Sequence, residues 1–252
     1  MGAPLFPRDH RRMTTPLGSE TLSPSLRHAT NYYGWIAEQF GSTLGRRVLD
    51  IGGGMGPLLD HVIGPARDIL SIDLDPLAVE EIRQRFEAQG RVSSRVANIL
   101  EEKDLQGLIE GGFDSILCVN VLEHIQDDAS ALAAMLRILP PRGYLNLLVP
   151  AHPFLYGTPD ELAGHFRRYR RQDLVKLARA AGFDVRDAYF FNGFGAIPYF
   201  LNARVFKPKS LSGAVDTQIV LYDRYFVPVL RRLERRVRPP FGQSLIIVAQ
   251  KP

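Results

Sequence analysis

One stretch near the start of the chain constrains the fold more than any other. Residues 47–56 read Arg-Val-Leu-Asp-Ile-Gly-Gly-Gly-Met-Gly, an apolar and β-branched run that leads directly into glycines. The apolar run predicts a buried strand, and the glycines predict a tight turn that lets backbone approach a ligand closely. An apolar helix start follows at Pro57. A strand, a glycine turn and a helix in this order are typical of an element that cradles a nucleotide.

Strand-like and helix-like segments alternate after this element, which predicts an α/β fold. Five buried strands are expected at residues 46–52, 69–73, 92–97, 113–119 and 144–149, with helices or loops between them at 56–64, 76–89, 99–111 and 127–139. After a helix at 172–181, a sixth strand is expected at 185–191 and a last apolar strand at 243–249. We predict a doubly wound, Rossmann-like sheet of seven strands, mostly parallel, whose last strand inserts antiparallel between the fifth and sixth.

The composition narrows the classes of protein to which the chain can belong. A net charge of +4 is mildly basic and does not by itself indicate nucleic acid. Cys118 is the only cysteine, so no internal disulfide can form, which fits a reducing cytoplasm. No apolar run approaches the ~18 residues of a spanning helix, and residues 1–15 lack the apolar core of a secretory signal. We expect a cytoplasmic protein without integral membrane association and with a disordered leader.

Polar side chains lie at or just beyond the carboxyl end of each of the first five predicted strands. They are Asp50, Asp73, Asn98, Asn120 and His152. In a doubly wound sheet, ligands bind at the carboxyl ends of the strands, near the point where the strand order reverses. We therefore expect these five side chains to converge on one rim.

The residues around the glycine turn distinguish between possible nucleotides. A dinucleotide fingerprint beginning at Gly52 would need glycine where Pro57 stands. Asp50 directly before the turn would repel a pyrophosphate, whereas it suits a cationic amine. Asp73 can accept hydrogen bonds from two ribose hydroxyls. A ligand with an amine near the turn, a ribose at the next strand and no phosphate is S-adenosylmethionine.

Four motifs in order resemble those of class I S-adenosylmethionine-dependent methyltransferases of the UbiE-like, small-molecule type. They occupy residues 48–56, 71–75, 113–125 and 140–145, and Gly53 stands where the family commonly has cysteine or serine. The resemblance implies the cofactor and the reaction type, and it says little about the acceptor.

The resemblance also implies a role for particular residues around S-adenosylmethionine. Asp50 with the backbone of Gly52 and Gly54 would hold the methionine part, and Asp73 would hold the ribose. The remaining implied contacts are Leu74, Asn98 and Ile99 around the adenine, and Asn120 to Leu122 near the sulfonium. Asn98 fits a structural turn equally well, and Glu123 with His124 is interpreted as an element that braces the motif.

Residues 151–171 form a polar and aromatic insertion where the acceptor is expected to bind. His165 is the leading candidate for a catalytic base because an imidazole titrates near neutral pH, the alternative being a structural pair with Asp160. Tyr33 in the helix at 31–40 is a second catalytic candidate, the alternative being that it packs this helix onto the domain. The predicted substrate-binding residues are Tyr156, Asp160, Tyr169, His152 and Phe154, and no set of metal ligands could be assembled.

These features together predict one methyltransferase domain over residues 1–252. Residues 1–45 would form a leader and a lid helix, 46–150 the cofactor-binding core, and 151–171 and 192–238 two acceptor-side insertions. The expected reaction is metal-independent methylation, at carbon, nitrogen or oxygen, of a small aromatic or indole-type natural product. The alternatives are a lipid, quinone or glycan acceptor at a membrane surface, an RNA-binding methyltransferase, or a cofactor-binding module without catalysis. We expect a monomer or homodimer that does not bind nucleic acid.

Overall fold

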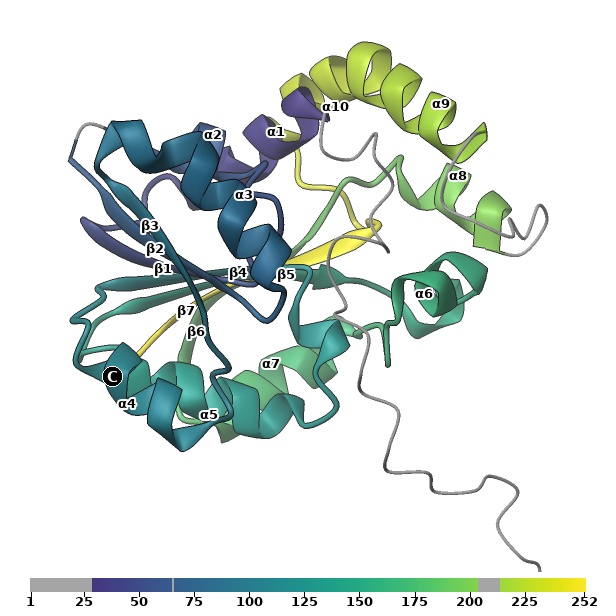
Figure 1. Cartoon of the computed structure of the whole chain (residues 1–252). Coiled ribbons are helices and arrows are strands. Elements are labelled where there is room, and N and C mark those ends of the chain that lie inside the picture. The colour runs from purple at the N-terminus through teal and green to yellow at the C-terminus, as the bar shows by residue number, and fades with distance from the viewer. Residues whose placement is uncertain (1–28, 65, 204–213) are drawn as a thin grey trace, which may run out of the picture.

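A seven-stranded sheet forms the centre of the computed structural model, which describes residues 29–64, 66–203 and 214–252 (Figure 1). Its strands are β1 (Arg47–Ile51), β2 (Asp68–Asp73), β3 (Val92–Val96), β4 (Ser115–Val119), β5 (Tyr144–Pro150), β6 (Asp184–Phe191) and β7 (Ser244–Gln250). Their order across the sheet is β3-β2-β1-β4-β5-β7-β6. The first five strands pair in parallel, and β7 lies antiparallel to both β5 and β6. The predicted architecture, including the place of the last strand, is confirmed.

Helices cover both faces of this sheet, and each face has its own apolar core (Figure 1). One face carries α1 (Thr30–Phe40), α2 (Leu59–Val62), α3 (Pro76–Phe86) and α10 (Val227–Glu234), and the other carries α4 (Glu102–Ile109), α5 (Asp128–Ile138) and α7 (Arg171–Ala180). Successive strand residues point to opposite faces. In β1, Val48 accordingly packs into the first core and Leu49 into the second.

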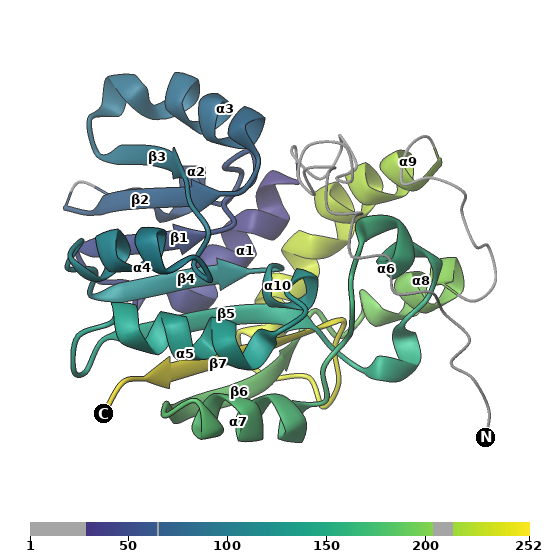
Figure 2. The same cartoon turned by 60° about the horizontal axis from the view of Figure 1, so that its bottom comes forward.

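A third group of short helices lies beyond the carboxyl ends of the parallel strands (Figure 2). It contains α6 (Thr158–Ala163), α8 (Ala196–Leu201) and α9 (Ala214–Leu221), and a π-helical turn, Tyr222–Phe226, joins α9 to α10. Shorter 3-10 turns are η2 (Glu87–Gln89), η3 (Leu122–His124) and η4 (Pro153–Leu155). The predicted insertions at 151–171 and 192–238 supply these helices, so the chain between the later strands is placed over one end of the sheet.

The N-terminal helix α1 is packed into the core. Trp35 and Phe40 are fully buried, and the Trp35 ring lies 4.3 Å from that of Phe191 on β6. The Asp223 carboxylate accepts a hydrogen bond from the backbone N–H of Tyr32 at 2.8 Å, which satisfies a free donor in the first turn of α1. Burying each large aromatic stabilises the fold by roughly 2–3 kcal/mol. These contacts favour the packing role for this helix over that of a movable lid.

Local differences from the predicted elements have identifiable causes. The helix expected at 56–64 is shortened to α2, because the left-handed φ of +73° at Gly56 still belongs to the turn. The helical region at 192–238 is divided among α8, α9, the π-helical turn and α10. The predicted leader at 1–15 lies outside the described residues. In the described parts of the chain, no helix combines the length and apolar character needed to cross a membrane.

Candidate functional site

The carboxyl edge of the sheet gathers the five polar residues predicted to meet there. Because β1 to β5 are parallel, their ends lie along one edge (Figure 2). Asp50 is the penultimate residue of β1, Asp73 is the last residue of β2, and Asn120 follows β4 directly. Asn98 and His152 each come two residues after the end of their strand. The helices of the two insertions lie beyond this edge (Figure 2).

The glycine turn after β1 adopts a conformation that requires glycine. Gly52, Gly54 and Gly56 have φ angles of 68°, 54° and 73°, in the left-handed region that a side chain disfavours. The Gly52 N–H donates to the Ile72 carbonyl at 2.7 Å, and the Gly54 N–H donates to Oδ2 of Asp73 at 2.9 Å. The turn is therefore fastened to the end of β2. Each Asp73 oxygen retains a lone pair that can accept from a ribose hydroxyl.

The Asp50 carboxylate lies beneath this turn. It is 3% exposed and accepts a hydrogen bond from the Ser71 hydroxyl at 2.7 Å. Burial, reinforced by the charge of Asp73 and opposed by the Ser71 bond, raises the pKa of Asp50 to about 6. A Cβ atom on Gly53 would overlap Ser71 Oγ and Asp50, which explains glycine where the family commonly has a larger residue. The sequence analysis did not identify Ser71. Its position opposite Asp50 depends on how β1 pairs with β2 in the sheet.

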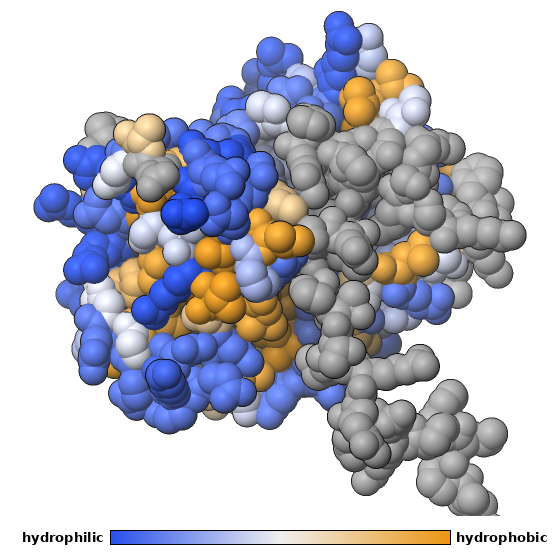
Figure 3. Space-filling view, viewed as in Figure 1, coloured by the Kyte–Doolittle hydropathy of each residue, from blue (hydrophilic) through white to orange (hydrophobic). Residues whose placement is uncertain are grey.

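The next part of the rim presents apolar side chains where the adenine is expected. Leu74 is 60% exposed, as suits a side chain that packs on a flat ring. Figure 3 shows apolar residues gathered between the α3 side and the α4–α5 side of the molecule. The exposed apolar residues around the ends of β2 and β3 include Leu74, Leu77, Val96 and Leu100. Asn98 Oδ1 accepts from the Leu100 N–H at 3.0 Å, so this side chain forms the structural turn that was its alternative role.

Two residues predicted to contact the cofactor have their side chains in the core. Ile99 is 4% exposed and Leu122 is fully buried. Any cofactor contact from these positions would therefore come from main-chain atoms. Asn120, with a φ of 54°, turns the chain sharply after β4 and brings Val121 over the glycine turn, where a Cβ on Gly52 would overlap it. Sequence reasoning did not single out Val121 within the predicted 120–122 segment.

The insertion after β5 holds His165 through a buried ion pair. Nδ1 of His165 lies 2.8 Å from Oδ1 of Asp160, and Nε of Arg168 donates to the same oxygen at 2.8 Å. Burial alone would raise the pKa of Asp160. The hydrogen bond from His165 and the charge of Arg168 nevertheless hold this pKa below its usual value. The Tyr199 ring on α8 stacks on the Arg168 guanidinium at 4.0 Å, and its hydroxyl bonds to Asp160. The predicted pairing of His165 with Asp160 is present, and Tyr199 is a further member that the sequence did not indicate.

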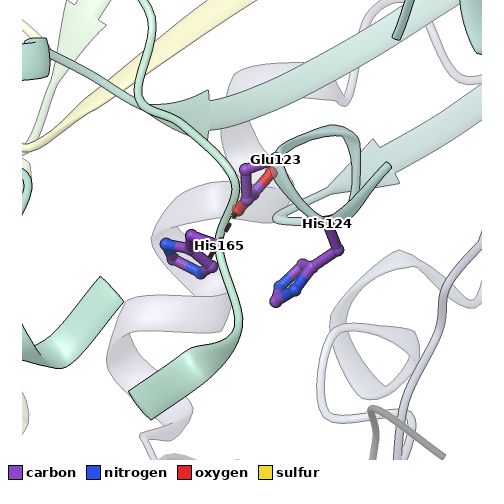
Figure 4. A group of neighbouring side chains, drawn as sticks. All are labelled: Glu123, His124 and His165. Atoms are coloured by element: carbon purple, nitrogen blue, oxygen red, sulfur yellow. Dashed lines mark ion pairs between the residues drawn. The ribbon is translucent and has the colours of Figure 1, made fainter. Parts of the chain in front are cut away.

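His165 also faces two residues of η3 (Figure 4). Its Nε2 lies 4.0 Å from Oε1 of Glu123, and its ring centroid lies 4.7 Å from that of His124. Glu123 is completely buried, which raises its pKa to about 8. The pKa of His124 is lowered to about 4, mainly by burial and to a lesser extent by the charge of His165. These three residues are the group that could hold a metal ion among the described histidines, cysteines and acids.

The other predicted acceptor-side residues surround this centre. The Tyr156 hydroxyl donates to the His165 carbonyl at 2.8 Å, and the buried Tyr169 hydroxyl donates to Asp128 Oδ2 at 3.0 Å. His152 stacks on Phe190 at 4.7 Å, and Phe154 is 63% exposed beside it. Tyr156 and Tyr169 thus hold the insertion in place, whereas the exposed Phe154 ring lies 5.2 Å from the ring of His152.

Tyr33 lies on α1, outside the insertion. Its ring is 6.0 Å from that of Tyr32 and packs against the core on the α1 face of the sheet. Burial raises the pKa of Tyr33, so its hydroxyl keeps its proton at neutral pH and can donate a hydrogen bond rather than act as a base.

Known proteins share both the sequence pattern and the fold. A family model described as a methyltransferase domain matches residues 25–188. The ubiquinone biosynthesis O-methyltransferase of Thiobacillus denitrificans is 28% identical over 156 residues, which cover 57% of this chain and 66%, just under two thirds, of that protein. The S-adenosylmethionine-dependent methyltransferase from Archaeoglobus fulgidus has a TM-score of 0.56 at 16% identity, over 89% of this chain and 94% of that one.

A second solved structure carries a cofactor product. The N-methyltransferase NodS from Bradyrhizobium japonicum, in complex with S-adenosyl-L-homocysteine, has a TM-score of 0.53 at 16% identity and covers 91% of this chain and 89% of that one. At such identities, both solved structures establish the shared fold.

Proposed function

Because the chain belongs to the methyltransferase domain family, whose cofactor is S-adenosylmethionine, we propose that it methylates a small aromatic acceptor at the carboxyl edge of its sheet. The methyl carbon breaks its bond to the sulfonium and forms one to the acceptor, and sulfur keeps the electron pair. The acceptor loses a proton, and the products are the methylated acceptor and S-adenosylhomocysteine. The enzyme must align the two reactants and receive that proton.

The single observation that carries this proposal is the buried Asp160–His165 pair next to the segment after β4. Asp160 holds Nδ1 of His165, so Nε2 points toward η3 and the space near the predicted sulfonium position. An imidazole oriented by a carboxylate in this way is suited to take a proton from a hydroxyl or amine. His165 is the residue at which we place acceptor deprotonation.

Exposed aromatic residues near the insertion favour an aromatic acceptor. Phe154 is 63% exposed and Phe166 is 51% exposed, and the His152 ring already stacks against Phe190. Exposed rings offer flat surfaces to a ring-shaped ligand, with a gain of about 0.5–1.5 kcal/mol per aromatic pair beyond burial. An indole-type or phenolic natural product fits these surfaces, with carbon, nitrogen or oxygen as the methylated atom.

A second candidate acceptor is a quinone or lipid intermediate at a membrane surface. The Thiobacillus denitrificans relative is a ubiquinone biosynthesis enzyme by name. In and beyond α10, Val229, Leu233 and Val237 recur every four residues and are each more than half exposed. Exposed arginines, Arg232 and Arg236, flank this stripe. An apolar stripe beside basic residues is typical of helices that lie on anionic membranes.

Acceptor screening by mass spectrometry tests the proposal. Purified protein with S-adenosylmethionine is offered indoles, phenols and catechols in solution, and short-chain quinols with anionic vesicles. We expect one class to gain a single methyl group, and we expect His165→Ala to lower turnover while the affinity for S-adenosylmethionine stays the same. His61→Ala, on α2, is the matched control. Failure to methylate any aromatic acceptor by a protein that binds the cofactor would contradict the proposal.

A further inference from the structure

Glu123, His124 and His165 present unused ligand atoms to one another. One atom from each residue lies within 4.8 Å of the other two. Neither Glu123 carboxyl oxygen has a hydrogen-bond partner on another described residue, and Nδ1 of His124 is likewise buried and unpaired. A buried polar atom without a partner destabilises the fold, and natural folds retain few of them. The unpaired carboxyl group of Glu123 and the unpaired Nδ1 of His124 belong to the same cluster as His165, which indicates a ligand that satisfies them together.

We propose that Glu123, His124 and His165 bind a divalent transition-metal ion beside the methyl-transfer site. Imidazole nitrogens favour zinc, cobalt, nickel and iron over magnesium and calcium, whose preferred ligands are oxygens. Two histidines and one carboxylate are also a known ligand set of catalytic zinc sites, which keep a fourth position open. In this protein the open position would face the space that the acceptor enters.

The surroundings of the two histidines prepare them as ligands. Nδ1 of His165 is held by the Asp160 carboxylate at 2.8 Å, which leaves the Nε2 lone pair directed at Glu123. The other nitrogen of the His124 ring is held by the backbone of Gly164, which leaves its Nδ1 free. Metal-binding histidines in proteins commonly donate their second N–H to a carboxylate or a backbone carbonyl. Both histidines show this arrangement, and Arg168 fixes Asp160 in turn.

The distances need only a small closure around an ion. Bonds of about 2.0–2.1 Å in a tetrahedron place ligand atoms about 3.4 Å apart, whereas Nε2 of His165 is 4.0 Å from Oε1 of Glu123. The two segments that carry the ligands are already joined, because the Phe166 N–H donates to the Glu123 carbonyl at 2.8 Å. Side-chain rotation can therefore bring the ligand atoms together without separating η3 from the insertion.

Metal binding would change how the acceptor loses its proton, and this part of the inference rests on the proposed function. An acceptor hydroxyl in the fourth position would be acidified by the cation. Its proton would pass to water, and the resulting oxygen anion would attack the methyl carbon while sulfur takes the electron pair. Nε2 of His165 has one lone pair, so with the ion bound this residue acts as a ligand and not as the base.

Cobalt titration of chelator-treated protein, with no acceptor present, tests the site directly. Co²⁺ bound to nitrogen and oxygen ligands in a tetrahedral site gives visible absorption bands that aqueous Co²⁺ lacks. We expect these bands to saturate at one equivalent and to disappear on addition of zinc. Glu123→Gln and His165→Ala should each weaken binding by tenfold or more, whereas the control His61→Ala should leave it unchanged. Retained binding of S-adenosylmethionine by each variant shows that it is folded.

The possible outcomes separate this inference from the proposed function. If no bands appear, or if His61→Ala removes them while Glu123→Gln does not, the metal site is refuted. Methylation that persists in a strong chelator by a protein without cobalt binding would leave the proposed function standing and His165 as the base. Cobalt binding at the three residues by a protein that methylates no aromatic acceptor would support the site and contradict the acceptor class.

Discussion

Asp50 provides a prediction about stability, because its carboxylate is buried beneath the glycine turn. Its pKa rises from 3.8 to about 6, chiefly through burial. Between these values the folded chain holds a proton that the unfolded chain has released. The stabilisation from this group is therefore fully present below pH 3.8 and is lost as the pH rises through about 6. A difference of about two pKa units corresponds to roughly 3 kcal/mol.

The substitution Asp50→Asn removes this titration and keeps an oxygen that can accept the Ser71 hydrogen bond. We expect the free energy of unfolding of the variant, relative to wild type, to increase by roughly 3 kcal/mol from about pH 4 to about pH 7. Urea denaturation of the two cofactor-free proteins at several pH values measures this difference. Titrations that both proteins share cancel in the comparison.

A control substitution tests whether the effect depends on burial. Asp68→Asn changes a carboxylate on the neighbouring strand β2 whose side chain is 65% exposed. We expect a much smaller pH-dependent difference from wild type for this variant. The reasoning is refuted if the stability curves of Asp50→Asn and wild type stay parallel across this range, because a buried carboxylate that titrates normally would not be destabilised by its surroundings.

Three further predictions concern the cofactor turn and the insertion. Asp73→Ala should weaken S-adenosylmethionine binding by tenfold or more, roughly 1.4 kcal/mol, and calorimetry that finds unchanged affinity would contradict the ribose assignment. Gly53→Ala should lower the melting temperature, because its Cβ would overlap Ser71, and calorimetric melting measures the loss. Tyr199→Phe keeps the ring on Arg168 but loses the Asp160 hydrogen bond, so kcat and its pH profile should change while KM stays constant.

The sequence predicted the sheet and the identity of the cofactor because both depend on local patterns. A buried apolar strand followed by glycines can be recognised within ten residues, and Asp73 is recognisable by its place at the end of the next strand. The antiparallel place of β7 was predicted from chain order and confirmed. The lid role of the first helix stays a prediction, and the contact that supports its packing alternative, Trp35 against Phe191, joins residues more than a hundred positions apart.

The acceptor side was harder to predict because its residues meet through long-range contacts. His165 and Asp160 are neighbours in sequence, and their pairing was among the alternatives considered. Glu123 and His124 were interpreted as bracing residues, since nothing in the sequence places them opposite His165. Tyr199 joins the same group from α8, beyond β6. Such a cluster becomes visible only when the insertion is folded over the end of the sheet.

The position of β7 also has a consequence for the order in which the sheet can form during synthesis. Among the described strands, β6 pairs only with β7, and β7 is the last to leave the ribosome. Until then β6 has no partner, and β5 keeps an open, apolar edge that includes Leu147. Unpaired apolar edges favour pairing with other chains. The nascent protein should therefore depend on chaperones longest at this edge, and loss of the final strand should release β6 as well.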